Sequence, residues 1–119
     1  MRMEFTIDMH GVKSEKDVML RFADVLKIEN FYGNSWDAFF DDMRSLETES
    51  KIIREAPEMV DEVLLVVLST FDIAHHVSDK CYSLLSEILL ECTDPTEQDQ
   101  IKKFYVQVQR SCTHPEHAR

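Results

Sequence analysis

The sequence predicts an α/β domain in which helices pack on a small three-stranded parallel sheet, with elements in the order β-α-α-β-α-β. Three observations predict this class. Residues 3–7 and 104–108 alternate apolar and polar side chains, the period of a strand with one buried face. Residues 63–68 are continuously apolar, as in a strand buried on both faces of a parallel sheet. Helical patterns separate these runs, so the strands should be parallel, with residues 63–68 central or nearly so.

The first helix is predicted at residues 14–28. His10 and Gly11 break the first strand, and Ser14 suits a helix N-cap with Asp17 three residues later. One face of this segment is apolar, formed by Val18, Phe22, Val25 and Leu26. This face is expected to pack on the sheet.

The second helix follows a turn that ends at Gly33. Either Asn34 or Ser35 can cap it, and the helix dipole favours Asp37 in its first turn. Its apolar stripe comprises Trp36, Phe39, Phe40, Met43 and Leu46. Because each residue advances about 100° around a helix, Phe40 falls at the edge of the stripe and should be half exposed.

The other side chains of this helix divide into core and surface. We expect Trp36, Phe39 and Met43 to be core residues. Asp37 and Asp41 stack at i, i+4 beside the stripe, whereas Asp42 falls on its other flank and should be solvated.

The remaining elements follow from the same patterns. Residues 47–58 are charged and form a connector with room for a short helical turn, and residues 71–79 form a loop or short helix. A third helix is predicted at residues 80–92, ended by Thr93-Asp94-Pro95. Its apolar side comprises Cys81, Leu84, Leu85, Ile88 and Leu89. We expect one domain at residues 1–112 and a polar tail at 113–119.

Charge indicates the kind of partner. The chain of 119 residues has 23 acidic and 13 basic side chains and a formal charge of -10. Direct binding to nucleic acid is therefore not expected, because phosphates require a basic surface. Residues 35–62 contain nine acidic and three basic side chains, so -6 of the -10 lies there. Such a field steers a basic protein toward this region.

Other classes of protein find little support. The three cysteines have no metal-ligand spacing, and Cys81 is expected to be a reduced core thiol. No signal peptide or membrane-spanning run is apparent, so we expect a soluble, cytoplasmic protein that does not bind membranes and is monomeric when free. Asp37 and Asp41 could bind magnesium, with His75 or His76 as a base. The chain, however, has two glycines and no phosphate-binding loop, so neither catalysis nor a cofactor is expected. Cys112, His114 and His117 could bind zinc only weakly.

Residues 31–43 carry a family resemblance. They read Phe31, Tyr32, Gly33, Asn34, Ser35, Trp36, Asp37, Ala38, Phe39, Phe40, Asp41, Asp42, Met43. This motif and the order of elements resemble the barstar family of ribonuclease inhibitors. The glycine, the Asp-Ala pair and the second aspartate match that family's pattern in identity and spacing. Two departures concern recognition: Ser35 stands where the family has asparagine, and Phe40 where it has an exposed tryptophan.

The resemblance implies roles for the matching residues. Asp41 would enter the phosphate-binding subsite of a ribonuclease, and Asp37 would contact its basic rim. Phe31 and Phe40 would pack on the nuclease, while Gly33 and Ser35 would shape the loop. The predicted partner-binding set is completed by Asn34, Arg44 and Glu87, the last on the helix before the final strand.

The sequence as a whole thus predicts an immunity protein that binds a cognate, basic ribonuclease toxin one to one and blocks its active site. A second function uses the same residues: a non-inhibitory interaction module that binds another basic protein through the acidic surface.

Overall fold

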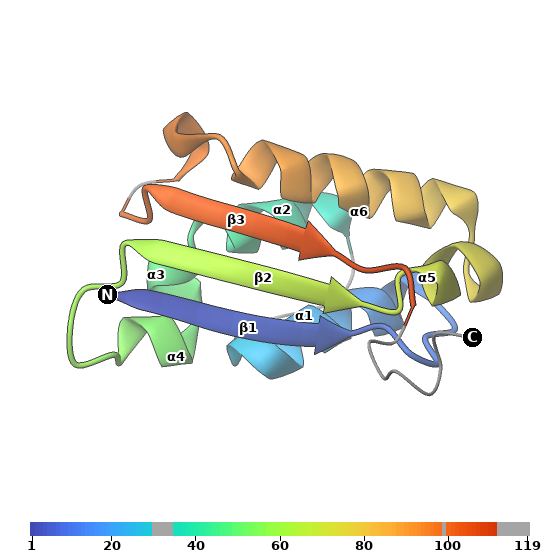
Figure 1. Ribbon diagram of the computed structural model, residues 1–119, viewed down its shortest axis with the longest axis horizontal. Helices are drawn as coiled ribbons and strands as arrows, with labels where there is room; N and C mark the ends of the chain where they lie inside the picture. Colours follow the sequence, from blue (N-terminus) through green and yellow to red (C-terminus); the bar gives the residue numbers. More distant parts are fainter. Residues whose placement is uncertain (30–34, 99, 112–119) are drawn as a thin grey trace.

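The computed structural model describes residues 1–29, 35–98 and 100–111. Its three strands are β1 (Arg2–Asp8), β2 (Glu62–Leu68) and β3 (Lys103–Val108), and they form a parallel sheet in the order β1-β2-β3 (Figure 1). In register, Phe5 pairs with Leu65, which pairs with Val106. The predicted α/β class and the central place of residues 63–68 are confirmed.

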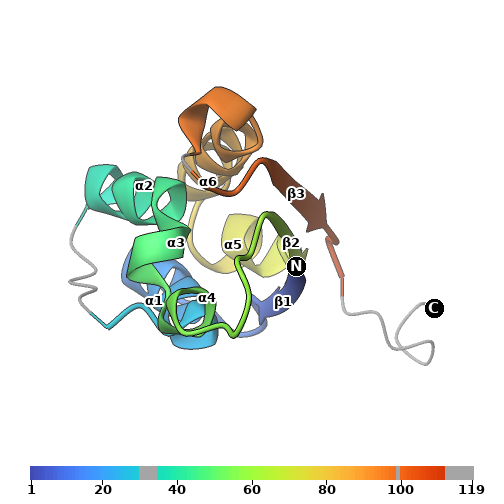
Figure 2. The same ribbon diagram turned by 90° about the vertical axis from the view of Figure 1, so that its left-hand side faces the viewer.

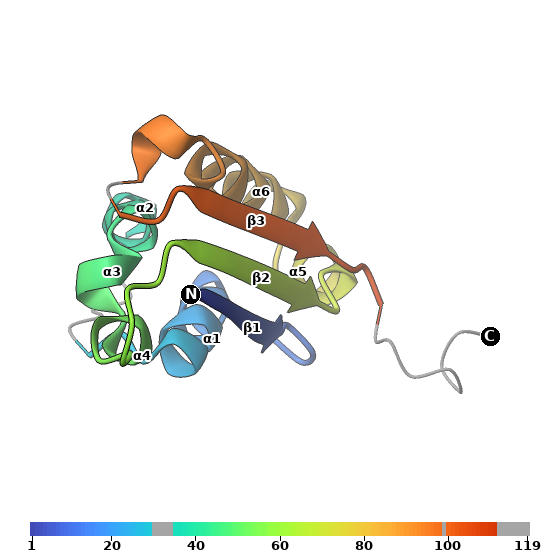
Figure 3. The same cartoon turned by 60° about the vertical axis from the view of Figure 1, so that its left-hand side comes forward.

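The connections between the strands are helical. The helices are α1 (Glu15–Leu26), α2 (Trp36–Arg44), α3 (Leu46–Glu49), α4 (Lys51–Arg54), α5 (Phe71–His76) and α6 (Asp79–Cys92), followed by the 3-10 helix η1 (Pro95–Glu97). The predicted connector therefore contains two short helices, α3 and α4, at the end of the sheet where the strands begin (Figure 3). None of the helices in the described residues is long and apolar enough to cross a membrane.

All the helices lie on one face of the sheet (Figure 2). Crossovers between parallel strands are almost always right-handed. Because β1, β2 and β3 follow one another in the same direction across the sheet, both crossovers are expected to cover the same face. Within the described residues, the opposite face carries no layer of helices.

This one-sided arrangement corrects the prediction that residues 63–68 are buried on both faces. Val63, Leu65 and Val67 face the helices and are fully buried. The alternate residues Leu64, Val66 and Leu68 are only half-buried. Their partial burial comes from the flanking strands, so an apolar run in a central strand did not require a second helical layer.

A corner between α1 and α4 fixes the chain where it leaves α1. Ile28 forms an isolated antiparallel bridge with Ser50. The buried Ser50 hydroxyl donates to the Leu26 carbonyl at 2.6 Å and accepts from the Ile53 amide at 3.3 Å, which caps α4. The chain that leads to α2 therefore starts from a fixed position.

Candidate partner-binding site

The start of α2 is set by Ser35. Its backbone is extended, and its hydroxyl accepts a hydrogen bond from the Ala38 amide at 3.1 Å. This satisfies one of the amides that a helix N-terminus leaves unpaired. Of the two predicted caps, Ser35 is thus the one used, whereas Asn34 lies outside the described residues, as do Phe31 and Gly33.

One face of α2 is anchored in the core. Phe39 and Met43 are almost completely buried, as predicted. The centroid of the Phe39 ring lies 5.2 Å from that of Phe22 in α1 and 5.6 Å from that of Trp36, and both pairs are T-shaped. Aromatic pairs prefer such geometries, so they favour one orientation of the rings in addition to burying apolar area. The rotation of α2 about its axis is thereby fixed.

The two ends of α2 are tied to other elements. At the first turn, the half-buried Trp36 donates its indole N–H to the Glu15 carboxylate of α1 at 3.0 Å. At the last turn, the buried Gln98 amide donates to the carbonyls of Met43 and Cys92, each at 3.2 Å. Gln98 thus joins the C-terminal ends of α2 and α6. Sequence analysis missed Glu15 and Gln98, since neither belongs to a periodic pattern or a motif.

The outward face of α2 carries two unpaired carboxylates. Asp37, Ala38 and Asp41 are exposed. Asp37 and Asp41 are one turn apart, and within the described residues neither forms an ion pair or a hydrogen bond through its carboxylate. We call Asp37 and Asp41 the acidic edge of α2. It is available to cationic groups of another molecule.

Phe40 and Arg44 form a small unit beside the acidic edge. Phe40 is half-buried, as its place in the stripe predicts. The Arg44 guanidinium lies 5.0 Å from the centroid of the Phe40 ring, and its Nε is 3.5 Å from a carboxylate oxygen of Glu97. A cation over an aromatic face is an attractive contact. Arg44 is thus occupied by its own chain and does not neutralise Asp37 or Asp41.

Asp42 differs from its prediction. It is half-buried rather than solvated. Burial, with help from the nearby Glu49 and Asp41 carboxylates, raises the pKa of Asp42 from 3.8 to about 6. The cause is the turn at Ser45, which ends α2 two residues before Leu46, the last residue of the apolar stripe, and brings α3 back toward this flank.

Glu87 is exposed on α6 and has no ion pair in the described part of the chain. Residues of α6 that face β3 include Ser86 and Leu90. At about 100° per residue, Glu87 lies nearly opposite the buried Leu85 and Leu89, so it is on the outward side of α6. Its role in partner binding stays a prediction.

The metal-site alternatives would need histidine or cysteine side chains in addition to Asp37 and Asp41. Among the described residues, no group of three or more His, Cys, Asp or Glu side chains could hold a metal ion. His75 and His76 belong to α5, where His75 stacks on Phe71. Cys81 and Cys92 are buried free thiols, and burial raises the pKa of Cys81 to about 11 and that of Cys92 to about 12. Neither is a reactive thiolate. Cys112, His114 and His117 lie outside the described residues.

Comparison with known families decides what kind of protein carries this helix. The family model for barstar, the barnase inhibitor, matches residues 2–109. The chain belongs to the barstar family. The match covers the whole sheet and every helix described above, and so extends well beyond residues 31–43. No curated protein matches the chain.

Barstar-family membership supports a role as an inhibitor of a barnase-like ribonuclease. Proteins of the barstar family are inhibitors rather than enzymes, and their partner is a ribonuclease.

Proposed function

We propose that this barstar-family protein is the immunity protein of a cognate ribonuclease toxin, which it binds one to one inside the producing cell. The acidic edge of α2 enters the RNA-binding groove, with Asp41 in a phosphate subsite and Asp37 at the basic rim. Phe31 and Phe40 pack on the nuclease, and Glu87 adds a carboxylate from α6. RNA is excluded because the cationic side chains of the nuclease cannot bind these carboxylates and the RNA phosphates at the same time.

One observation carries this proposal: the acidic edge is exposed, and unpaired among the described residues, on a helix that is fixed at both ends. A ribonuclease groove is built for a polyanion, so two carboxylates at a fixed spacing meet cations that are already in place. Because α2 is ordered before binding, association costs little further side-chain and backbone entropy. Close charge pairs in the barnase–barstar complex itself couple by about 1.5–7 kcal/mol.

The Phe40–Arg44 unit supports the same geometry. A free guanidinium next to the acidic edge would repel a basic groove. Glu97 offsets the charge of Arg44, and the Phe40 ring holds it to one side. The partner would therefore meet Asp37 and Asp41 with little opposition, together with the uncovered part of the Phe40 ring.

The test is capture by matched variants. Extract of the producing cell is passed over immobilised wild-type protein, Asp41→Asn or Asp24→Asn, and the protein released is assayed on a fluorogenic RNA. Asp24 is an exposed aspartate of α1 with no ion pair in the described residues, so the control has the same charge change. We expect Asp41→Asn to weaken binding by about thirtyfold or more, or about 2 kcal/mol, and Asp24→Asn to change it little.

The outcomes separate the two candidate functions. If the wild type captures a ribonuclease, and the released enzyme loses its activity when purified wild-type protein is added to it, the result supports inhibition. A captured basic protein without ribonuclease activity, lost with Asp41→Asn, indicates the interaction module. If both variants capture the ribonuclease equally well, α2 is not the binding site.

A further inference from the structure

The free edge of β3 lies beside an apolar groove. The described residues form no further strand beyond β3, so this strand pairs with β2 on one side only. A groove of about 180 Å³ lies between β3 and α6. Figure 2 shows β3 at the edge of the sheet and away from α2. The residues that line the groove are all outside the partner-binding set: Ser86, Leu89, Leu90, Thr93, Val106 and Val108.

The backbone of β3 directs half of its polar groups to this open edge. The Lys103 amide donates to the Asp61 carbonyl at 3.1 Å, and the Gln109 amide, just after β3, donates to the Val67 carbonyl at 2.8 Å. Successive residues of a strand point their N–H and C=O groups to opposite sides, so the odd-numbered residues of β3 pair with β2. The even-numbered residues point away from β2, and they are Phe104, Val106 and Val108. Their backbone groups form a row of donors and acceptors that another strand can complete.

Exposed apolar side chains flank the groove. Leu90 is 71% exposed and Val108 is 46% exposed, although both are large apolar residues. Among the described residues, no charged side chain lines the groove, since Glu87 and Glu91 of α6 lie outside its lining. A peptide that adds to a sheet edge places alternate side chains in pockets beside that edge. Backbone pairing and apolar contact are therefore both available to an extended segment at β3.

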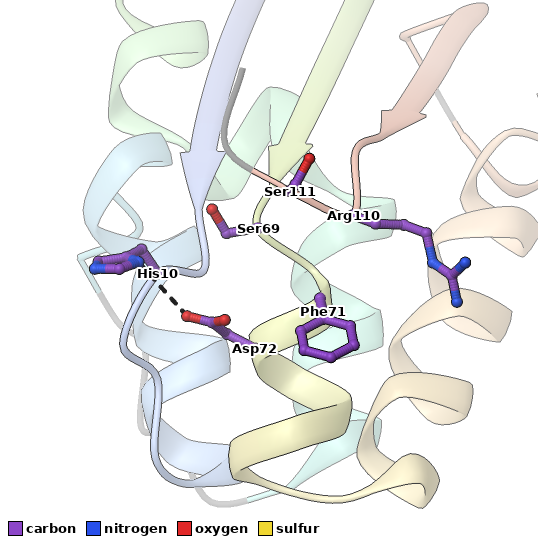
Figure 4. A pocket seen from close by; sticks show the side chains of 6 residues that line it. All are labelled: His10, Ser69, Phe71, Asp72, Arg110 and Ser111. Carbon is purple, nitrogen blue, oxygen red and sulfur yellow. Dashed lines mark ion pairs between the residues drawn. The ribbon is translucent and has the colours of Figure 1, made fainter. Parts of the chain in front are cut away.

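The charge around β3 is opposite to that of the whole chain. Residues 100–111 contain Lys102, Lys103 and Arg110 and no acidic residue, whereas the full chain has a formal charge of -10. Lys102 and Arg110 have no carboxylate within ion-pair distance in the described part of the chain. In Figure 4, the Arg110 side chain extends away from Asp72, toward the side of the sheet that β3 forms. These cations favour an acidic segment at the edge and oppose a second copy of this chain, which would bring the same cations.

We propose that the free edge of β3 binds an extended, acidic segment of another protein, which joins the sheet as an additional strand. The segment pairs with the backbone of the even-numbered residues of β3 and places apolar side chains in the groove beside Leu90. Its carboxylates meet Lys102 and Arg110 at the two ends of the strand. This site is independent of the proposed ribonuclease binding, since it uses none of those residues.

A synthetic peptide tests the chemistry of the segment. A capped peptide of alternating valine and threonine, flanked by aspartates, is titrated into the full chain by calorimetry. One control peptide has lysines in place of the aspartates, and another has an N-methylated backbone. We expect saturable binding of the acidic peptide and binding of each control that is weaker by about tenfold or more. Equal binding of the lysine peptide contradicts the role of charge, and no binding of the acidic peptide at millimolar concentration contradicts the site.

Hydrogen exchange locates the added strand. In the free protein, the amides of Tyr105 and Gln107 are paired with β2 and should exchange slowly, whereas those of Val106 and Val108 face the open edge. Binding of the acidic peptide should slow exchange at Val106 and Val108 and leave the two paired amides nearly unchanged. Unchanged exchange at Val106 and Val108 in the presence of bound peptide contradicts pairing at this edge.

Variants separate edge pairing from other modes of binding. Val106→Pro removes an amide that points to the open edge, where proline is tolerated, so β3 should stay paired with β2 while peptide binding is lost. Leu90→Asp should weaken binding of the acidic peptide by about tenfold, whereas Met59→Asp, at another exposed apolar residue, should not. Unchanged affinity in Leu90→Asp overturns the site even if Val106→Pro does not fold. Dimers of the free chain in sedimentation, lost with Leu90→Asp, would assign the edge to a second copy and overturn the proposal.

Discussion

Asp37 and Asp41 repel each other across one turn of α2, and no cation of the described chain relieves that repulsion. Like charges at i, i+4 destabilise a helix by a few tenths of a kcal/mol. The proposed binding residues thus slightly oppose the stability of the free protein. They are favourable only when a cationic partner is present.

This conflict predicts opposite effects of one substitution. Asp41→Asn should raise the free energy of unfolding of the free protein by about 0.3 kcal/mol while it weakens ribonuclease binding. Urea unfolding monitored by Trp36 fluorescence measures the first effect. A clear loss of stability in Asp41→Asn would mean that the carboxylate has a structural role.

Asp42 makes stability depend on pH in an unusual direction. Its pKa is about 6 in the folded state against an ordinary 3.8, so between these values the folded protein binds more protons than the unfolded chain. The contribution of Asp42 to stability therefore grows as the pH falls from about 7 to 4. Asp42→Asn should stabilise the protein by about 1 kcal/mol at pH 7, less than full burial would give because water screens the group.

Urea titrations of Asp42→Asn and the wild type across this pH range check the prediction. The difference between the two proteins should shrink toward zero near pH 4. Asp24→Asn, which changes an exposed aspartate, should show no such trend. A constant difference at all pH values would rule out proton uptake by Asp42.

At the scale of elements, α2 owes its position to contacts outside its own sequence. Its N-terminal turn is tied to α1 through Trp36 and Glu15, and its C-terminal turn to α6 through Gln98. The Trp36–Glu15 and Gln98–Met43 contacts join residues far apart in the sequence. The position of α2 therefore depends on the packing of α1 and α6.

Gln98→Leu should therefore loosen the end of α2. The substitution leaves the carbonyls of Met43 and Cys92 without their donor in a buried site, at an expected cost of about 1–3 kcal/mol. Gln107→Leu, at an exposed position of β3, is the matched control. Equal stability of the two variants, measured by urea unfolding, would show that the Gln98 bridge contributes nothing.

The order of elements was predictable because it is local. Alternation marked β1 and β3, the apolar run marked β2, and Ser14, Ser35 and the Pro95 stop bounded the helices. The one-sided sheet was missed because the apolar side chains of Leu64 and Val66 were taken as a sign that β2 is buried on both faces. A run of apolar residues indicates that a strand is buried, but it does not indicate whether helices or neighbouring strands cover each face.

The candidate site was predictable only on its outward face. The spacing of Asp37, Phe40 and Asp41 depends on the helix alone, and their exposure follows from the apolar stripe. Asp42 was misjudged because its surroundings come from α3, after a turn at Ser45 that has no strong signal. Glu15 and Gln98 act through tertiary contacts, which periodicity cannot reveal.

At the scale of the whole molecule, the charge of -10 is concentrated in residues 35–62, which include α2. Association with a basic ribonuclease should therefore be electrostatically steered. We expect the association rate to fall by about tenfold or more between low and physiological ionic strength, while the dissociation rate changes little. Stopped-flow mixing at several salt concentrations measures both rates. An association rate that does not depend on salt contradicts steering.

One face of the sheet is free of helices in the part of the chain that the structure describes, and this has a practical consequence. Thr6 and Gln107 point outward from that face, with the whole core between them and α2 (Figure 2). A dye or a surface tether attached through cysteine at either position would leave the acidic edge of α2 unobstructed. Single complexes could therefore be counted on a surface without any change to the residues proposed to form them.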